Sequence, residues 1–209
     1  MKVKVCGNRD LNQLKQLNEL AIDYAGFIFY EQSPRYVLKE IKGEDVKGLK
    51  LDIEKVGIFV NATEEEIMKQ IDDFGLDVVQ LHGDETASFC ERISDHIKVI
   101  KVFRIADIDM NIDWLVKEYD EVCDYYLFDK GSAGLFGGTG EKFNWTLLAK
   151  STIGKPFFLS GGIDINDAEA LKRFEHPFFY GVDVNSRFET EPGIKDMNLI
   201  KEFVKQLKN

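Results

Sequence analysis

Eight short apolar runs, separated by charged and amphipathic stretches, recur along this chain of 209 residues. Most runs are continuous rather than alternating in polarity, which is typical of parallel strands covered on both faces. Eight strands alternating with helices in a chain of this length favour an α/β fold, a single-domain (β/α)8 TIM barrel over residues 1–209. A doubly wound open sheet is the alternative. The predicted strands are residues 3–6, 25–29, 56–60, 78–81, 99–103, 125–128, 157–159 and 180–182.

The best-marked helix between two of these runs begins near Thr63. Thr63 and Glu66, three positions later, form the capping-box pattern, in which each side chain bonds to the backbone N–H of the other. Gly75 is expected to end this helix, because glycine adopts the left-handed backbone of a helix terminus without strain. The buried stripe of the helix is expected to contain Ile67, Ile71 and Phe74.

Two other helices are predicted near the ends of the sequence, and one central segment is ambiguous. Asp10 is the expected cap of the first of these helices. The segment 39–55 is rich in glycine and charge and does not favour a full helix. The first helix is expected to bury Leu14, Leu17 and Ala21, and the last to bury Ile200, Phe203, Val204 and Leu207.

The composition excludes several classes of partner. A net charge of −10 argues against nucleic acid and against anionic membrane surfaces. There is neither a signal-peptide pattern nor an apolar run near the roughly 18 residues of a membrane span. The three cysteines form no CxxC pair, which predicts reduced thiols, a cytoplasmic location and no metal site; Cys90 and Cys123 are expected in the core.

Chemistry-bearing residues follow most of the predicted strands. In a (β/α)8 barrel, the residues after each strand converge on one face, where the active site lies. We therefore expect a shared site that contains a thiol, an imidazole, an acid, two arginines and two candidate anion-binding segments. These residues are Cys6, Arg35, Asn61, His82, Arg104, Asp129, 160–162 and 183–186.

Asp129 ends the sixth apolar run and precedes the glycine-rich segment 131–140. A carboxylate at the end of a buried strand lies at the mouth of a pocket, where it can act as a general acid. The glycines would let the segment close over a ligand as a lid. An aspartate that only caps a turn is the structural alternative.

The segments after the seventh and eighth runs predict a phosphate site. Gly161 and Gly162 follow the seventh run, and the polar residues Asp183, Asn185 and Ser186 accompany the end of the eighth. Barrels commonly hold phosphate on the backbone N–H groups of these two loops, and glycine permits the close approach. A plain turn is the alternative for a glycine pair alone.

Arg35, Cys6 and His82 each allow two interpretations. Arg35 follows Pro34 and could clamp a carboxylate with its planar guanidinium, or it could be a solvated surface residue. Cys6 could be a reactive thiol or a small buried hydrophobe. His82 is expected to line the pocket rather than to catalyse.

Taken in order, these segments resemble the phosphoribosylanthranilate isomerase family of tryptophan biosynthesis. The resemblance covers nearly the whole chain, and no single motif carries it. The matching segments are KVCG at 4–7, SPR at 33–35, VGIFVN at 56–61, LHGDE at 81–85, LFD at 127–129, GGTG at 137–140, LSGGI at 159–163 and GVDV at 181–184.

The resemblance implies a (β/α)8 isomerase without cofactor or metal, a monomer or homodimer, that acts on a small phosphorylated substrate. It implies Cys6 as general base, Asp129 as general acid and Arg35 as the contact of the anthranilate carboxylate. Gly161 and Gly162, with the backbone after the eighth strand, would hold the phosphate. For a base working near neutral pH, we expect cations such as Lys4 and Arg35 to lower the pKa of Cys6.

Two rival functions remain at this stage. The first is the related isomerase of the histidine pathway, which uses two aspartates, whereas the first strand here ends in Cys6. The second is a non-catalytic barrel that binds phosphorylated ligands. Such a barrel would need the glycine site but has no use for both Cys6 and Asp129, and a turnover assay separates the two.

Overall fold

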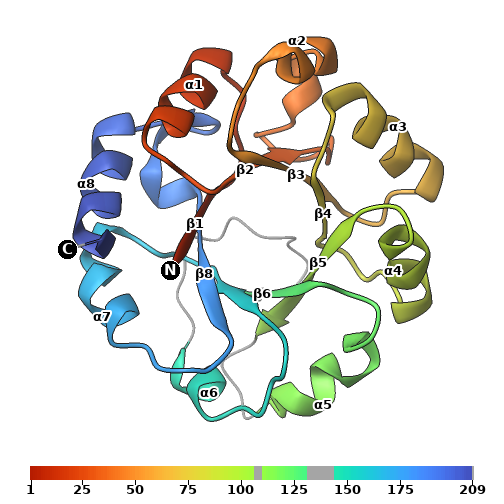
Figure 1. Ribbon diagram of the computed structural model, residues 1–209, viewed down its shortest axis with the longest axis vertical. Coiled ribbons are helices and arrows are strands. Elements are labelled where there is room, and N and C mark those ends of the chain that lie inside the picture. Colours follow the sequence, from red (N-terminus) through yellow and green to blue (C-terminus); the bar gives the residue numbers. More distant parts are fainter. Residues whose placement is uncertain (106–109, 131–143, 209) are drawn as a thin grey trace.

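The computed structural model describes residues 1–105, 110–130 and 144–208. The predicted lid at 131–140 lies outside these residues. Within them, eight parallel strands form a closed barrel in chain order, and β1 pairs with β8 to close it (Figure 1). This confirms the predicted barrel and excludes the open sheet. The strands are β1 (Lys2–Val5), β2 (Tyr24–Ile28), β3 (Glu54–Phe59), β4 (Val78–Leu81), β5 (Lys98–Ile105), β6 (Tyr125–Lys130), β7 (Phe157–Leu159) and β8 (Phe179–Val184).

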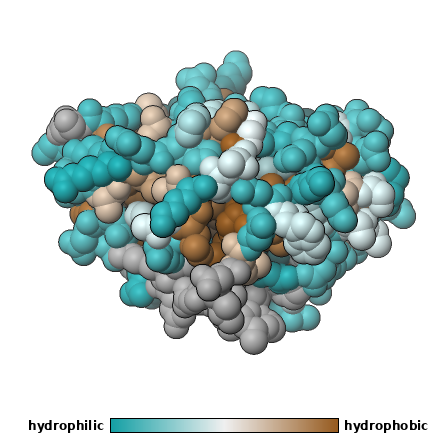
Figure 2. All heavy atoms as spheres, turned by 90° about the horizontal axis from the view of Figure 1, so that it is seen from below, coloured by the Kyte–Doolittle hydropathy of each residue, from teal (hydrophilic) through white to brown (hydrophobic). Residues whose placement is uncertain are grey.

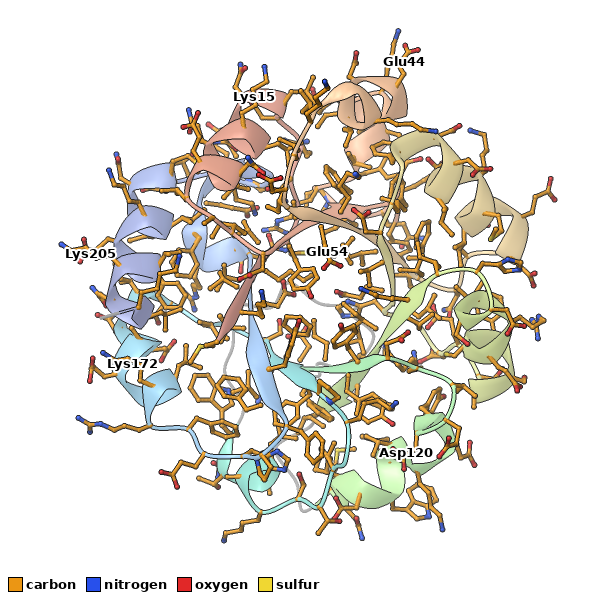
Figure 3. The ribbon with its side chains drawn as sticks, in the orientation of Figure 1. Lys15, Glu44, Glu54, Asp120, Lys172 and Lys205 are labelled. Carbon is orange, nitrogen blue, oxygen red and sulfur yellow. The ribbon has the colours of Figure 1, made fainter. Side chains whose placement is uncertain are left out.

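Helices surround the barrel and turn their charged faces outward (Figures 1 and 3). In Figure 3, Lys15, Glu44, Lys172 and Lys205 extend away from the barrel. The α-helices are α1 (Leu11–Glu19), α2 (Gly43–Gly48), α3 (Glu64–Phe74), α4 (Ala87–Ser94), α5 (Ile112–Val116), α6 (Thr146–Ala149), α7 (Ala168–Lys172) and α8 (Met197–Lys208). Short 3-10 turns are η1 (Val37–Lys39), η2 (Lys117–Tyr119), η3 (Ile165–Asp167) and η4 (Ser186–Phe188), and a hairpin after β8 comprises β9 (Glu189–Glu191) and β10 (Ile194–Lys195).

The predicted helix signals at α3 are confirmed. The Thr63 hydroxyl accepts from the N–H of Glu66, the Glu66 carboxylate accepts from the N–H of Thr63, and Gly75 ends the helix at φ +60°. Ile67 and Phe74 are fully buried in the helix–barrel layer.

The helix predictions elsewhere are confirmed except at Ala21 and at Leu207, which is partly rather than fully buried on α8. Asp10 caps α1 by accepting from the N–H groups of the residues two and three positions on. The expectation of a buried Ala21 is wrong, because α1 ends at Glu19 and Ala21 is exposed in a left-handed turn at φ +52°. The ambiguous segment 39–55 contains only the six-residue helix α2.

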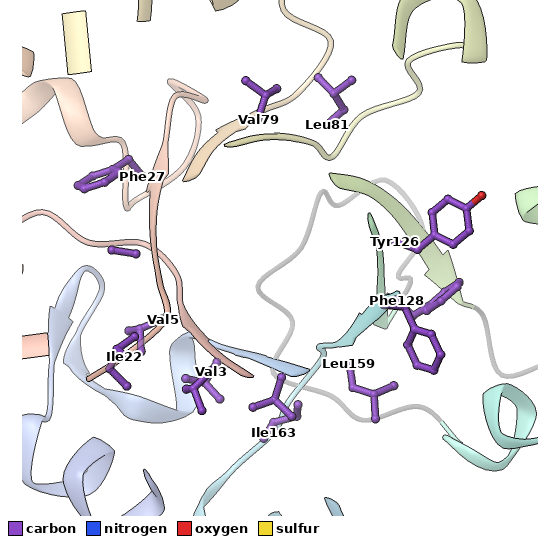
Figure 4. Packing of buried hydrophobic residues seen from close by; sticks show 14 of the residues in the cluster. Val3, Val5, Ile22, Phe27, Val79, Leu81, Tyr126, Phe128, Leu159 and Ile163 are labelled. Carbon is purple, nitrogen blue, oxygen red and sulfur yellow. The ribbon is translucent and has the colours of Figure 1, made fainter. Parts of the chain in front are cut away.

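Two apolar layers hold the fold together. One lies between the strands and the helices; there Phe27, Val79 and Tyr126 point outward from the barrel wall (Figure 4). The other fills the barrel and includes Val56 and Phe158. Because strand side chains alternate, β1 sends Val3 and Val5 outward and directs Lys4 and Cys6 inward.

Aromatic side chains close the barrel at the N-terminal ends of its strands. The Tyr24 and Tyr180 hydroxyls lie 3.0 Å apart, and the Phe158 ring contacts both residues edge-on. Glu54, at the start of β3, lies toward the middle of the barrel in Figure 3. This plug leaves the opposite end of the barrel, at the C-terminal strand ends, for chemistry.

The molecular face in Figure 2 is mostly hydrophilic, with an apolar area near its centre. None of the described helices is long and apolar enough to cross a membrane.

Candidate active site

Cys6 directly follows β1, it packs with the groups that fill the barrel, and the residue is 5% exposed. Gly26 on β2 gives the thiol its space, since a Cβ on Gly26 would lie 3.1 Å from the Cys6 sulfur. The glycine that follows, Gly7, has φ +74° and turns the chain sharply out of the strand. The thiol is therefore held at the barrel mouth in a tight, mostly dry position.

A buried ion pair involves Lys4, which precedes Cys6 by two residues and points to the same side of the strand. Lys4 and Asp183 are register partners in β1 and β8, and the Lys4 Nζ donates to Asp183 Oδ1 at 2.8 Å. Lys4 is fully buried. Burial on its own would lower the pKa of Lys4, but Asp183 and the Cys6 sulfur outweigh it and raise that pKa. Lys4 therefore remains a cation close to the thiol.

The expected lowering of the Cys6 pKa is wrong in direction. Burial is the largest influence and raises the pKa of the thiol, while Lys4, Lys195 and Arg35 oppose that rise. The sequence pointed to the cations but not to the degree of desolvation, which disfavours the thiolate. The thiolate population in the free protein is therefore smaller than the nearby positive charges alone would suggest.

Asp129 faces the same mouth from β6. β6 continues to Lys130, so Asp129 is the next-to-last residue of the strand and pairs with Arg104 of β5, whereas the sequence placed it just after the strand. Its side chain is 9% exposed, and Oδ1 accepts from the N–H of Lys130 at 2.9 Å. The second oxygen, Oδ2, lies 3.6 Å from the His82 Nε2, which is longer than a hydrogen bond.

His82 lies beside Asp129 at the C-terminal ends of the strands. The Gln80 Nε2 lies 3.2 Å from the His82 Nδ1, and the buried Nε2 of His82 has no hydrogen-bond partner among the described residues. His82 therefore presents an unused polar atom toward Asp129.

The predicted phosphate segments also reach the mouth. Gly161 and Gly162, directly after β7, have φ of +83° and +64°, a backbone that favours glycine. A Cβ on Gly161 would lie 3.0 Å from Asp129 Oδ1, so this loop packs directly on the candidate acid. Ser186 opens η4 immediately after β8.

Arg35, from the loop after β2, reaches across the end of β1. A Cβ on Gly7 would lie 2.8 Å from the Arg35 Cδ and 2.9 Å from Asn185 Oδ1, so all three pack together beside Cys6. The Arg35 guanidinium is held by Glu189, to which Nε donates at 3.0 Å and Nη2 at 2.7 Å. Asn185 Oδ1 accepts from the Lys195 Nζ at 2.9 Å.

The sequence analysis missed Glu189 and Lys195. They belong to the β9–β10 hairpin, which follows the last barrel strand and folds back toward β2. Their only local signal is a charged pair flanking Pro192 and Gly193, which is ordinary for a surface turn.

Two predicted members lie away from the centre. Asn61 accepts from the N–H of Asp84 and receives no contact from the groups around Cys6 among the described residues. Arg104 forms an ion pair with Asp84 at the rim. Both tie neighbouring loops together.

The described residues contain no cluster of His, Cys, Asp and Glu that could hold a metal ion. A shallow hollow of about 550 Å³ lies near Met1, Leu171 and Phe179. It borders the N-terminal ends of β1 and β8, opposite Cys6 and Asp129, and is separate from this site. Cys90 and Cys123 are buried, as predicted.

Comparisons with known proteins agree with this geometry. The family model of N-(5'-phosphoribosyl)anthranilate isomerase matches residues 3–206. The isomerase of Parabacteroides distasonis is 40% identical over 212 aligned residues, covering 99% of this chain and 93% of the relative, and that of Aquifex aeolicus is 38% identical over 211. The crystal structure of the Thermotoga maritima isomerase aligns with TM-score 0.83 at 30% identity, covering 100% of this chain and 98% of that one. A further crystal structure, of an isomerase of this kind in complex with reduced 1-(o-carboxyphenylamino)-1-deoxyribulose 5-phosphate, aligns with TM-score 0.78. This chain therefore belongs to the N-(5'-phosphoribosyl)anthranilate isomerase family.

Proposed function

We propose that this protein converts N-(5-phosphoribosyl)anthranilate to 1-(2-carboxyphenylamino)-1-deoxyribulose 5-phosphate, an aldose–ketose isomerisation of L-tryptophan biosynthesis. The observation that carries this is the placement of a thiol and a carboxyl group, Cys6 and Asp129, at one barrel mouth between an arginine and a glycine loop. An Amadori rearrangement needs one acid and one base and no redox partner.

Asp129 is the proposed acid. It protonates the furanose ring oxygen, the C1′–O bond breaks, and the substrate nitrogen supplies the electron pair that forms an iminium ion. The contact between the Gly161 loop and Asp129 supports this role, because it places the acid next to the proposed phosphate site.

Cys6 is the proposed base. Its thiolate removes the C2′ proton, and the electron pair neutralises the iminium to give an enaminol. Addition of a proton to C1′ and loss of the proton from the C2′ hydroxyl then give the ketone. Lys4, held by Asp183, provides a fixed positive charge that favours the thiolate during this step.

Four of the remaining predicted residues are proposed to bind substrate directly. Arg35 would contact the anthranilate carboxylate, and Gly161 and Gly162 with the backbone at Ser186 would hold the phosphate. Asp183 and Asn185 would act through Lys4 and Lys195, with which they form hydrogen bonds.

We further propose one domain over 1–209, a cytoplasmic location, no cofactor or nucleic-acid partner, and a monomer or homodimer. One Thermotoga maritima relative is described as dimeric.

The test is the loss of substrate fluorescence on addition of purified protein. We expect turnover by the wild type and a fall in kcat of at least about 10²-fold in Cys6→Ser and in Asp129→Asn. Cys90→Ala removes a buried thiol on α4, in the layer outside the barrel, and should keep normal kcat. Absence of turnover by folded wild type, or near-normal kcat for Cys6→Ser, would refute the proposal.

A further inference from the structure

The Glu189 carboxylate accepts hydrogen bonds from one edge of the Arg35 guanidinium. The Arg35 Nε donates to both carboxylate oxygens at 3.0 Å, and Nη2 donates to Oε2 at 2.7 Å. Arginine has five N–H groups in a rigid plane. Glu189 uses the Nε–H and one N–H of Nη2, which leaves the other bidentate edge, Nη1 with Nη2, unused by Glu189 and directed elsewhere.

The carboxylate of Glu189 is itself immobilised. Its side chain is 4% exposed, and Oε1 accepts from the N–H of Gly193 at 3.0 Å and from the Lys195 Nζ at 2.6 Å. The Lys195 side chain is fully buried and also donates to Asn185 Oδ1. If Glu189 moved away from Arg35, the buried Lys195 would lose its carboxylate partner, which costs free energy.

The charges of this cluster do not cancel. Burial lowers the pKa of Lys195, and the contact with Glu189 opposes that shift. With Lys195 protonated, Arg35, Lys195 and Glu189 together carry one positive charge beside the barrel mouth. Burial alone would raise the pKa of Glu189, but Arg35 and Lys195 outweigh it and lower that pKa, which keeps the carboxylate ionised. A cluster with one surplus positive charge and one guanidinium edge that binds no other described residue matches a single carboxylate on a ligand.

We propose that Glu189 is a positioning residue that fixes Arg35 with its Nη1–Nη2 edge toward the carboxylate of the substrate's aromatic ring, with Lys195 holding Glu189 in place. This rests on the proposed function and adds a residue that decides selectivity for a carboxylated ring. The hairpin β9–β10 thereby becomes part of the binding machinery, although it is not part of the barrel.

The packing around Arg35 supports a directional role. The Arg35 stem crosses Gly7 with no room for even a Cβ, and the Asn185 amide packs against the same glycine. The Arg35 side chain is 12% exposed, so most of it is packed against the protein rather than free in solvent. An arginine held in this way loses little rotamer freedom when a carboxylate binds.

The decisive experiment uses two ligands with the full-length protein. One is the reduced product analogue with its carboxylate, and the other is the same compound with a phenyl ring that lacks it. Glu189→Gln should weaken inhibition by the carboxylated ligand about 10-fold, the scale of a charge-assisted hydrogen bond, and leave the other ligand unchanged. KM should rise by a similar factor while kcat changes less than about threefold.

Glu191→Gln is the matched control, because Glu191 lies on the same strand but is exposed. Glu189→Asp keeps the charge on a shorter stem and should give a smaller, still carboxylate-selective loss, which covers the case in which Glu189→Gln folds poorly. Equal weakening of both ligands would show that Glu189 only supports the hairpin. Tighter binding of the carboxylated ligand would show that Glu189 competes with it. Either result overturns the inference, whereas a wild type that neither turns over substrate nor binds either ligand would overturn the proposed function instead.

Discussion

Replacement of Lys4 by methionine tests how much the buried ion pair with Asp183 contributes to stability at the seam, the junction where β1 pairs with β8. The variant keeps most of the side-chain volume but leaves the Asp183 carboxylate, 7% exposed, without its cation. Removal of one partner from a buried pair destabilises a protein by about 3–5 kcal/mol. For a chain of this length that corresponds to a fall in Tm of about 6–20 °C.

The assay is thermal and urea unfolding of Lys4→Met beside two other variants. Lys2→Met is the matched control on the same strand; its ion pair with Asp23 is half-exposed, so its loss should cost less than about 1 kcal/mol. Adding Asp183→Asn to Lys4→Met removes the stranded charge and should restore most of the stability but not the activity. If Lys4→Met were no less stable than Lys2→Met, the pair would not be a buried ionic contact, and the reasoning about Lys4 and Cys6 would fail with it.

Three further predictions concern the reaction. Because burial raises the pKa of Cys6 and a base works only when deprotonated, kcat/KM should fall as pH drops through a pKa above the ordinary thiol value of about 8.5; a limb centred below pH 8 would contradict this. Arg35→Lys should raise KM about 10-fold with kcat less affected, since lysine lacks the planar fork, and a fall confined to kcat would exclude the carboxylate contact. Gly162→Asp should raise KM by more than about 10-fold, because it puts a carboxylate at the proposed phosphate site on a backbone with φ +64°. Gly154→Asp is the control and should leave KM unchanged, because no atom lies within 4 Å of a Cβ at Gly154. Equal effects of the two substitutions on KM would exclude the phosphate assignment.

The parts of the fold that were predictable from sequence depend on local chemistry. The capping box at Thr63 and the left-handed stop at Gly75 involve neighbours in the chain, so the residue types alone determine them. The barrel followed from the continuous apolar runs, since both faces of each strand are covered. Ala21 was misplaced because an apolar residue continues the helical period even where the helix has already ended.

The parts that were not predictable depend on contacts between distant residues. Glu189 and Arg35 lie 154 positions apart, and nothing near either residue identifies the other. The direction of the Cys6 pKa shift likewise depends on how completely β2 and the barrel interior cover the thiol, a quantity that a sequence motif does not contain. The sequence therefore predicted which groups gather at one end of the barrel, whereas the contacts between them depend on the three-dimensional structure.

The seam between β1 and β8 has a consequence for the order of folding. Lys4 and Asp183 are separated by 179 positions, and joining the ends of a flexible loop of that length costs on the order of 4–5 kcal/mol in entropy, apart from a constant. Contacts this distant form late, after the local strand–helix units, so we expect the seam to close near the end of the folding reaction. A chain with the first seven strands in place would still lack the carboxylate partner of Lys4, and Cys6, the proposed base, would lack its neighbours from β8. Enzymatic activity should therefore depend on the last folding event. During refolding, we expect activity to appear later than the helix content measured by circular dichroism.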